Sequence, residues 1–209
     1  VDGHAMGLEI YANHRRRYLY MSADPSQPRV HLVPDKLRRG LERPMQIGLM
    51  FRRYVEGGIV QHVSQPEWER VLIFDVDGPE GAVSIIIEPM ERRANLLLVQ
   101  DGVILDCVRR VGSDENRVRV SLPNHVYVPP PPQTGRKDPF VLTPDEFNTL
   151  FQENDDPKRK AAQVLSSRLL GVSPLLAKVI VYRAEGDVAV KASDVDIDSL
   201  FAQFESFML

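Results

Sequence analysis

Two clusters of charged and polar side chains stand out because each interrupts a run of apolar residues. The first is Glu69-Arg70, which follows Gln65-Pro66 and comes directly before an apolar run. The second is Arg92-Arg93 with Asn95, between two further apolar runs. An arginine guanidinium can make two parallel hydrogen bonds to a phosphate or a base edge. If the breaks fall at one end of a sheet, these arginines could together face an anion such as a phosphate, but from their spacing alone ordinary charges at a solvated rim are the simpler interpretation.

Catalytic and metal-binding patterns are absent from the sequence. The 5 histidines lie far apart, so a zinc site would need ligands from distant segments. No nucleophile elbow, phosphate loop or dinucleotide fingerprint is present. The carboxylate pairs Asp75 with Asp77 and Asp155 with Asp156 stand in turn or helix-cap contexts. We therefore expect no catalytic residue, no metal, no cofactor and no enzymatic activity.

Cysteine content and hydropathy indicate the compartment. Cys107 is the only cysteine, which fits a reducing environment, and its apolar surroundings in the sequence predict a core residue. No apolar run approaches the roughly 20 residues of a membrane span, and no signal peptide opens the chain. We expect a cytoplasmic protein that does not bind membranes. The net charge of −3 excludes a uniformly basic nucleic-acid binder, yet nearly every basic residue among the first 120 is arginine.

The elements that must position the two clusters are five short apolar runs separated by polar breaks. This pattern is typical of strands joined by tight turns, and we predict an antiparallel meander. Asp101-Gly102 is the strongest turn signal, because a type I′ hairpin needs positive φ at both central positions. Since some runs do not alternate, both faces of those strands should be covered, as in a sandwich or a sheet under helices. The predicted strands are Ile59 to Val63, Val71 to Val76, Ala82 to Ile87, Asn95 to Val99 and Val103 to Val108.

Strands and one helix are also predicted before the meander. Residues 8–12, 18–21 and 29–33 favour strands, whereas residues 1–6 have no periodicity. A helix should begin at Pro44 and end before Gly57-Gly58, because apolar residues recur there at three- and four-residue spacing. Its polar face carries Arg52 and Arg53, which we add to the candidate nucleic-acid-binding residues.

A proline-rich segment separates this part from a helical one. Pro129 to Pro132 cannot donate ladder hydrogen bonds, so we predict domains at residues 1–140 and 141–209. Thr143 to Glu146 forms a capping box, and Asp156-Pro157 predicts a second helix start. Gly171 to Pro174 ends that helix and begins the next, and a last amphipathic helix covers Ile197 to Met208. The Gly-containing turn indicates a helix-hairpin-helix-like unit, whose turn amides can bind a phosphate, but a generic αα-corner would look the same.

Taken together, the order of these motifs resembles the N-terminal domain of the NFACT family, which includes bacterial RqcH proteins, fibronectin-binding protein A-like proteins and eukaryotic NEMF. The resemblance covers about residues 18 to 185 and is specific as a combination. It is carried by residues 50–59, 65–70, 88–95, 104–111, 123–127, the proline run as far as Asp138-Pro139, and residues 171–177.

The resemblance implies an α+β fold. Its antiparallel β-rich domain is similar to that of formamidopyrimidine-DNA glycosylases and is followed by a helix-hairpin-helix domain. It also implies a ribosome quality-control factor that binds the obstructed large ribosomal subunit and recruits tRNA for alanine tailing. The family's Asp-Arg pair for tRNA engagement corresponds to Glu69-Arg70, where Glu lengthens the reach. Glu91 and Ala94 also depart from the family, and the chain is expected to be a fragment of a longer protein.

Three function classes follow. We predict an RNA-binding role in which Arg70, with Arg92, Arg93, Arg52 and Arg53 nearby, contacts tRNA, and Glu69 accepts from a base or orients Arg70. The alternative is a fibronectin- or fibrinogen-binding surface adhesin. A glycosylase-like DNA-binding enzyme is the third class, but a shared fold does not imply a shared function. This chain also begins Val1-Asp2 and not with an amine nucleophile such as proline.

Overall fold

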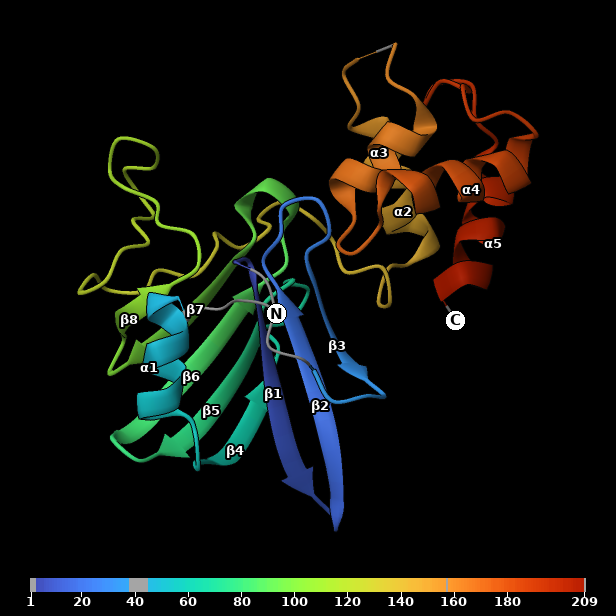
Figure 1. Cartoon of the computed structure of the whole chain (residues 1–209). Helices are drawn as coiled ribbons and strands as arrows, with labels where there is room; N and C mark the ends of the chain where they lie inside the picture. The colour runs from blue at the N-terminus through green and yellow to red at the C-terminus, as the bar shows by residue number, and fades with distance from the viewer. Residues whose placement is uncertain (1–2, 38–44, 157, 209) are drawn as a thin grey trace. The chain divides into compact units, whose positions relative to one another are not determined.

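The computed structural model describes residues 3–37, 45–156 and 158–208 and has an α+β architecture of antiparallel sheets and helices. Two compact units divide the chain, Val1–Pro131 and Pro132–Leu209. The first unit contains the strands and one helix, and the second contains four helices among the described residues (Figure 1). Pro44 and Pro157, two of the expected helix starts, lie outside the described residues.

A three-stranded antiparallel sheet opens the first unit, with order β1-β2-β3. Its strands are β1 (Ala5–Ala12), β2 (Arg15–Ser22) and β3 (Arg29–Val33). The expectation that residues 1–6 lack regular structure is wrong for Ala5 and Met6, which pair with Ser22 and Met21. The cause is cross-strand pairing with residues some 15 positions away, which a local periodicity does not register.

The meander predicted for residues 57–111 is confirmed as a five-stranded antiparallel sheet of order β4-β5-β6-β7-β8. At the expected type I′ turn, Asp101 and Gly102 have φ of 51° and 76°, so both lie in the left-handed region. The strands are β4 (Ile59–Ser64), β5 (Leu72–Gly78), β6 (Gly81–Glu88), β7 (Asn95–Gln100) and β8 (Val103–Cys107).

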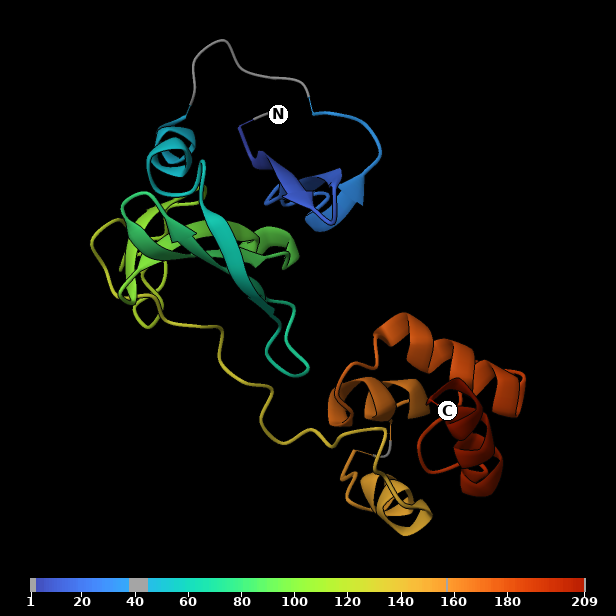
Figure 2. The ribbon, with the colours of Figure 1, turned by 90° about the horizontal axis from the view of Figure 1, so that it is seen from below.

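Both faces of the central strands are covered, as the apolar runs without alternation predicted. On one face, Ile85, Ile87, Leu96 and Leu98 join a core with the three-stranded sheet and helix α1 (Gln46–Tyr54). Figure 2 shows this sheet and α1 on the same side of the five-stranded sheet. The opposite face has its own core, in which Ile86, Leu97 and Val99 pack with residues including Ile104 and Tyr127. The first unit therefore combines a sandwich with a sheet under a helix.

The second unit is a helical cluster whose core includes Phe147, Leu165, Ile180 and Phe204. Its helices are α2 (Pro144–Gln152), α3 (Ala161–Arg168), α4 (Pro174–Glu185) and α5 (Ile197–Met208). The capping box of Thr143 and Glu146 is present, and Ser173 caps α4 after Gly171 at φ 67°. None of the described helices is long and apolar enough to cross a membrane.

Two local expectations for this unit differ from the structure. α3 begins at Ala161, after Lys160, and not at Asp156-Pro157. The backbone just before α3 is held in an extended conformation, because Ala161 N–H donates to the Val190 carbonyl and Lys160 forms an isolated antiparallel β-bridge with Lys191. The unit boundary falls at Pro132, earlier than the expected residue 140. The reason is that Lys137 exchanges backbone hydrogen bonds with Arg168 and Leu170, which ties the extended segment to the helices.

Candidate nucleic-acid interface

Two loops lie at the same end of the five-stranded sheet. The register pairs Leu72 of β5 with Ile87 of β6, and Ile87 with Leu96 of β7. Arg70 therefore leads into β5 at the end where the β6–β7 connection carries Arg92 and Arg93. We call Glu69, Arg70, Arg92 and Arg93 the arginine rim.

Hydrogen bonds within the β4–β5 loop fix the backbone beside Arg70. Glu69 N–H donates to the Pro66 carbonyl (3.0 Å), and Gln65 Nε2 donates to the Glu69 carbonyl (2.8 Å). Trp68 is held at φ 59°, an uncommon conformation for a bulky residue that gives the loop a sharp turn. The loop leaves Glu69 half-buried and Arg70 exposed, so it presents the Arg70 guanidinium to solvent.

The β6–β7 connection is a single 3-10 turn, η1 (Glu91–Arg93). Arg93 N–H donates to the Met90 carbonyl (2.9 Å), and Ala94 N–H donates to the Glu91 carbonyl (2.9 Å). Arg109 donates from one guanidinium nitrogen to the Arg92 carbonyl and from another to Glu115.

Both Arg92 and Arg93 are exposed on this braced turn. In the described parts of the chain no carboxylate forms an ion pair with Arg70, Arg92 or Arg93. The three guanidiniums are thus available to an external anion.

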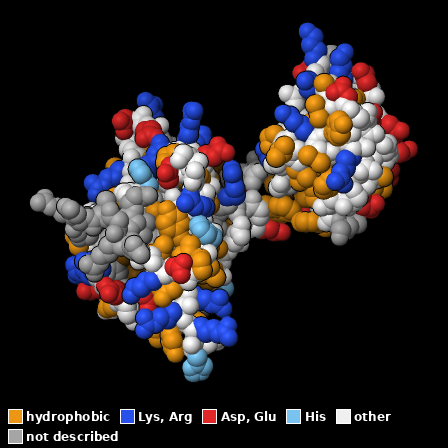
Figure 3. Space-filling view, turned by 45° about the vertical axis from the view of Figure 1, so that its right-hand side comes forward, with side chains coloured by type: hydrophobic (Ala, Val, Ile, Leu, Met, Phe, Trp, Pro, Cys, Tyr) orange, Lys and Arg blue, Asp and Glu red, His pale blue; other side chains and the backbone are white. Residues whose placement is uncertain are grey.

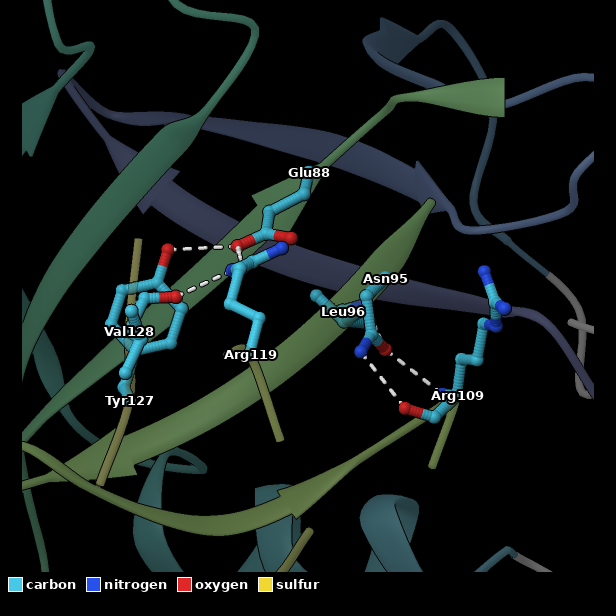
Figure 4. A network of polar contacts seen from close by, with 7 residues as sticks. All are labelled: Glu88, Asn95, Leu96, Arg109, Arg119, Tyr127 and Val128. Atoms are coloured by element: carbon cyan, nitrogen blue, oxygen red, sulfur yellow. Dashed lines mark hydrogen bonds and ion pairs between the residues drawn. The ribbon is translucent and has the colours of Figure 1, made fainter. Parts of the chain in front are cut away.

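Asn95 was expected at this surface, but the structure makes it a buried structural residue. Its side chain is only 3% exposed. Oδ1 accepts from Arg109 N–H (2.8 Å) and Leu96 N–H (3.0 Å), and Nδ2 donates to the Arg109 carbonyl (2.9 Å; Figure 4). Asn95 therefore holds the segment after β8 against the start of β7, which positions Arg109 beneath the arginine rim.

Glu88 anchors the other end of the same connection, and the sequence analysis did not single it out. The carboxylate is 1% exposed and accepts from Arg119 and from the Tyr127 hydroxyl (2.8 Å; Figure 4). Arg119 Nε donates to the Val128 carbonyl (2.6 Å). Burial raises the pKa of Tyr127 above its ordinary value, and the Glu88 charge raises it further. A charged residue directly after the apolar run Ile85–Ile87 was the available signal, since a buried carboxylate requires a partner.

Arg52 and Arg53 lie at the opposite end of the sheet, so their expected place near Arg70 is wrong. Arg53 pairs with Glu80 of the β5–β6 turn (3.3 Å). The chain order explains this, because α1 ends where β4 begins, and Ile59 of β4 pairs with Asp77 at the far end of β5. Arg70 instead follows the end of β4.

The remaining candidates offer no reactive group. Burial raises the pKa of the Cys107 thiol to about 12, with a smaller contribution from Asp106, and its Sγ donates to the Ser121 carbonyl (3.3 Å). Asp75 accepts a hydrogen bond from Ser84 (2.6 Å) within a strand pair. Within residues 3–37, 45–156 and 158–208, no group of three or more potential ligands could hold a metal ion.

Sequence comparison finds relatives named "Rqc2 homolog RqcH". The protein of Bacillus subtilis is 30% identical over 190 residues, which cover 87% of this chain and 32% of that protein. The protein of Streptococcus pneumoniae is 26% identical over 155 residues, which cover 71% of this chain and 28% of that protein. The chain thus spans about a third of the length of the curated relatives it matches.

Solved structures share the fold. The N-terminal part of the fibronectin/fibrinogen-binding protein of Streptococcus suis superposes with a TM-score of 0.74 at 22% identity, covering 99% of this chain and 73% of that one. The fibrinogen-binding protein of Staphylococcus aureus gives 0.74 at 21% identity, covering 99% and 71%.

A family model described as the NFACT N-terminal and middle domains matches residues 1–209. The match agrees with the motif order in the sequence and with the relatives and folds just given. The chain belongs to the NFACT family, whose N-terminal and middle domains it matches along its whole length.

Proposed function

We propose that the chain is the RNA-binding N-terminal part of a ribosome quality-control factor, acting in the cytoplasm without catalysis of its own. The whole protein would bind the obstructed large ribosomal subunit and recruit tRNA for alanine tailing of stalled nascent chains. Support comes from family membership and from relatives named as Rqc2 homologues. The observation that carries the proposal is the arginine rim, with three exposed guanidiniums on two braced loops and no described carboxylate paired to them.

Each rim residue has a distinct role in this proposal. Arg70, Arg92 and Arg93 contact phosphates, because a guanidinium fork can make two charge-assisted hydrogen bonds to phosphate oxygens. Glu69, which is half-buried, accepts from a base amino group or orients Arg70. Glu88 and Asn95 do not touch the RNA but fix the backbone on either side of the β6–β7 turn.

The finer assignment of the fold is also part of the proposal. The first unit would be similar to the β-rich domain of formamidopyrimidine-type glycosylases, and α3 and α4 would form a helix-hairpin-helix. The turn between these helices, with Gly171 at positive φ and Ser173 capping α4, supports the second assignment.

The test is the salt dependence of tRNA binding. Each neutralised phosphate contributes about 0.7 to 0.9 to the slope of log affinity against log salt. Replacing Arg70, Arg92 and Arg93 together by Ala should therefore reduce the slope by about 2 to 3. The matched control is Arg52→Ala, an exposed arginine at the opposite end of the sheet. A triple variant whose slope equals that of the control would overturn the assignment.

The ribosomal part of the proposal needs the full-length protein. Co-sedimentation with obstructed large subunits should be retained by the wild type and lost or weakened in the Glu69→Ala/Arg70→Ala variant. Equal co-sedimentation of wild type and variant would remove these two residues from the interaction.

Fibronectin or fibrinogen binding is the second candidate, because two proteins with the same fold carry these partners in their names. At 21% and 22% identity the likeness concerns the fold alone. Saturable binding of this chain to immobilised fibronectin at physiological salt would favour this candidate, and binding that disappears as salt rises to that level would count against it.

A further inference from the structure

The tip of the β1–β2 hairpin is a second cationic surface, separate from the arginine rim. We propose that this tip, residues 11–17, contacts the phosphates of a double-stranded stretch of structured RNA. The inference rests on the proposed function, because the ligand is the same RNA, but it concerns residues to which that function assigns no role. We call residues 11–17 the hairpin tip.

The hairpin tip extends past the sheet that supports its base. β3 pairs only with Tyr18 to Ser22 of β2, so Arg15, Arg16 and Arg17 lie beyond the third strand. Those three residues still pair with Ala12, Tyr11 and Ile10 of β1. Figure 1 shows the two strands projecting away from the rest of the first unit, with the tip at the opposite end from the 3-10 turn of the arginine rim. The tip is therefore a two-stranded ribbon that is accessible to a partner.

The turn at the end of the ribbon is well defined. Asn13 and His14 have φ of 51° and 58°, so both central residues are in the left-handed region that a type I′ turn requires. Because the twist of this turn matches the twist of the flanking strands, the register of the tip is fixed. The three arginines are consequently presented in a constant order along one strand.

Alternation along β2 places arginine side chains on both faces of the ribbon. Arg15 and Arg17 continue the face that holds Leu19 and Met21 in the core, and Arg16 points to the other face opposite Tyr11. All three arginines are exposed, and Tyr11 is 69% exposed. Arg16 pairs with Glu9 at 2.7 Å, but no described carboxylate pairs with Arg15 or Arg17. Figure 3 shows basic side chains over the lower part of this unit, where Figure 1 places the tip.

This distribution of charge favours a duplex over the acidic surface of a protein. A flat acidic surface would contact one face of the ribbon only, either Arg15 and Arg17 or Arg16, which also pairs with Glu9. A double-stranded RNA has phosphate backbones on both sides of a wide, shallow minor groove, and proteins recognise it by shape and phosphate contacts there. A ribbon with arginines on both faces can reach both backbones at once, and the exposed Tyr11 ring can pack on a ribose or a terminal base.

The test uses variants that remove charge and keep the strand pairing. Arg15→Gln/Arg17→Gln should weaken binding to a short RNA duplex about 10- to 30-fold at 0.1 M salt and lower the salt slope by about 1.5. Arg15→Lys/Arg17→Lys should keep most of the slope, because the charge remains. The matched control is Arg52→Gln/Arg53→Gln, which removes two arginines from α1. Thermal unfolding of all variants verifies that the fold is intact.

The outcomes separate this inference from the proposed function. If Arg15→Gln/Arg17→Gln binds the duplex like the control, the inference is wrong. The role of the arginine rim is tested separately, by the variant in which Arg70, Arg92 and Arg93 are replaced by Ala. If the rim variant binds normally and the hairpin variant does not, the rim assignment fails and the inference holds. An equal loss of affinity for a single strand of the same sequence, or loss of binding to polyglutamate with duplex binding intact, would overturn the duplex assignment.

Discussion

Glu88 and Arg119 show how a single buried ion pair supports an exposed loop. The Glu88 side chain is 1% exposed and that of Arg119 is 16% exposed, so neither charge is well solvated. Arg119 also lies over the Tyr127 ring, 6.0 Å from its centroid. Removing one partner of such a pair leaves an uncompensated buried charge, which costs more than the pair itself contributes.

We predict that Arg119→Ala lowers the free energy of unfolding by about 3 to 5 kcal/mol. Urea denaturation measures this value. The matched control is Arg117→Ala, two residues away, exposed and without an ion pair to a described carboxylate, which should change stability by less than about 0.5 kcal/mol. A similar, small effect of both substitutions would show that the Glu88–Arg119 pair is not needed.

Residue types in the sequence predicted which side chains carry charge, but not which of them are buried. Arg70, Arg92 and Arg93 are exposed at one end of the sheet, whereas Asn95, only two positions further, is sealed against Arg109. The partners of Glu88 lie 31 and 39 residues away, and no local pattern connects them. Burial of a polar residue is set by such distant contacts, which is why the sequence could not separate anchors from ligand-binding groups.

At the scale of elements, the start of α2 shows a local signal that determines structure. Thr143 N–H donates to Glu146 (3.0 Å), Glu146 N–H donates back to the Thr143 hydroxyl (3.3 Å), and Lys137 donates to Glu146 (3.2 Å). The backbone hydrogen bond from Thr143, followed by Lys137, lowers the pKa of Glu146 below its ordinary value of 4.5. The ionised form is thus favoured in the folded state.

The free energy of unfolding is therefore expected to fall at low pH. A carboxyl with a depressed folded pKa contributes stability that is fully present above about pH 4.5 and is lost as the pH falls through the lower folded value. Glu146→Gln should therefore make the unfolding of the helical unit less sensitive to pH between about 5 and 3. The control is Glu205→Gln in α5, an exposed carboxylate outside the capping box. Identical pH profiles for the wild type and Glu146→Gln would contradict the prediction.

Elements with strong local signals were predictable, and elements set by distant pairing were not. Asp101-Gly102 and the box at Thr143 each carry the chemistry of their own turn or cap. The start of α3 depends instead on hydrogen bonds to residues 190 and 191, and the start of β1 on its pairing with β2. The absence of a signal at Ala5 and Lys160 is thus a consequence of where their partners lie.

At the scale of the whole molecule, each unit has its own core. In the helical unit the Phe147 ring contacts Phe201 and Phe204, with centroids 5.1 Å away in both cases. A unit with its own core and short connections can fold alone. The order of the elements also determines at which end of the five-stranded sheet each arginine lies, since Arg52 precedes β4 and Arg70 follows it. This order was in the sequence, but it becomes informative only once the meander is known.

We predict that residues 132–209 produced alone give a helical circular dichroism spectrum and unfold cooperatively. Phe147→Ala should destabilise this fragment by about 3 to 5 kcal/mol, because it leaves a cavity in the helical core. Tyr182→Ala, at an exposed position of α4, is the control. A fragment with the spectrum of an unfolded chain would show that the second unit depends on the first.

The alkylation rate of Cys107 reports how often the first unit opens locally. At neutral pH a thiol with a pKa of about 12 carries almost no thiolate, and the Ser121 carbonyl covers it. An alkylating reagent can therefore react only during the rare moments when β8 separates from the segment around Ser121. Because the chain has one cysteine, its alkylation rate measures the frequency of that opening without an engineered probe. The same measurement with RNA bound would reveal whether the ligand slows the motion.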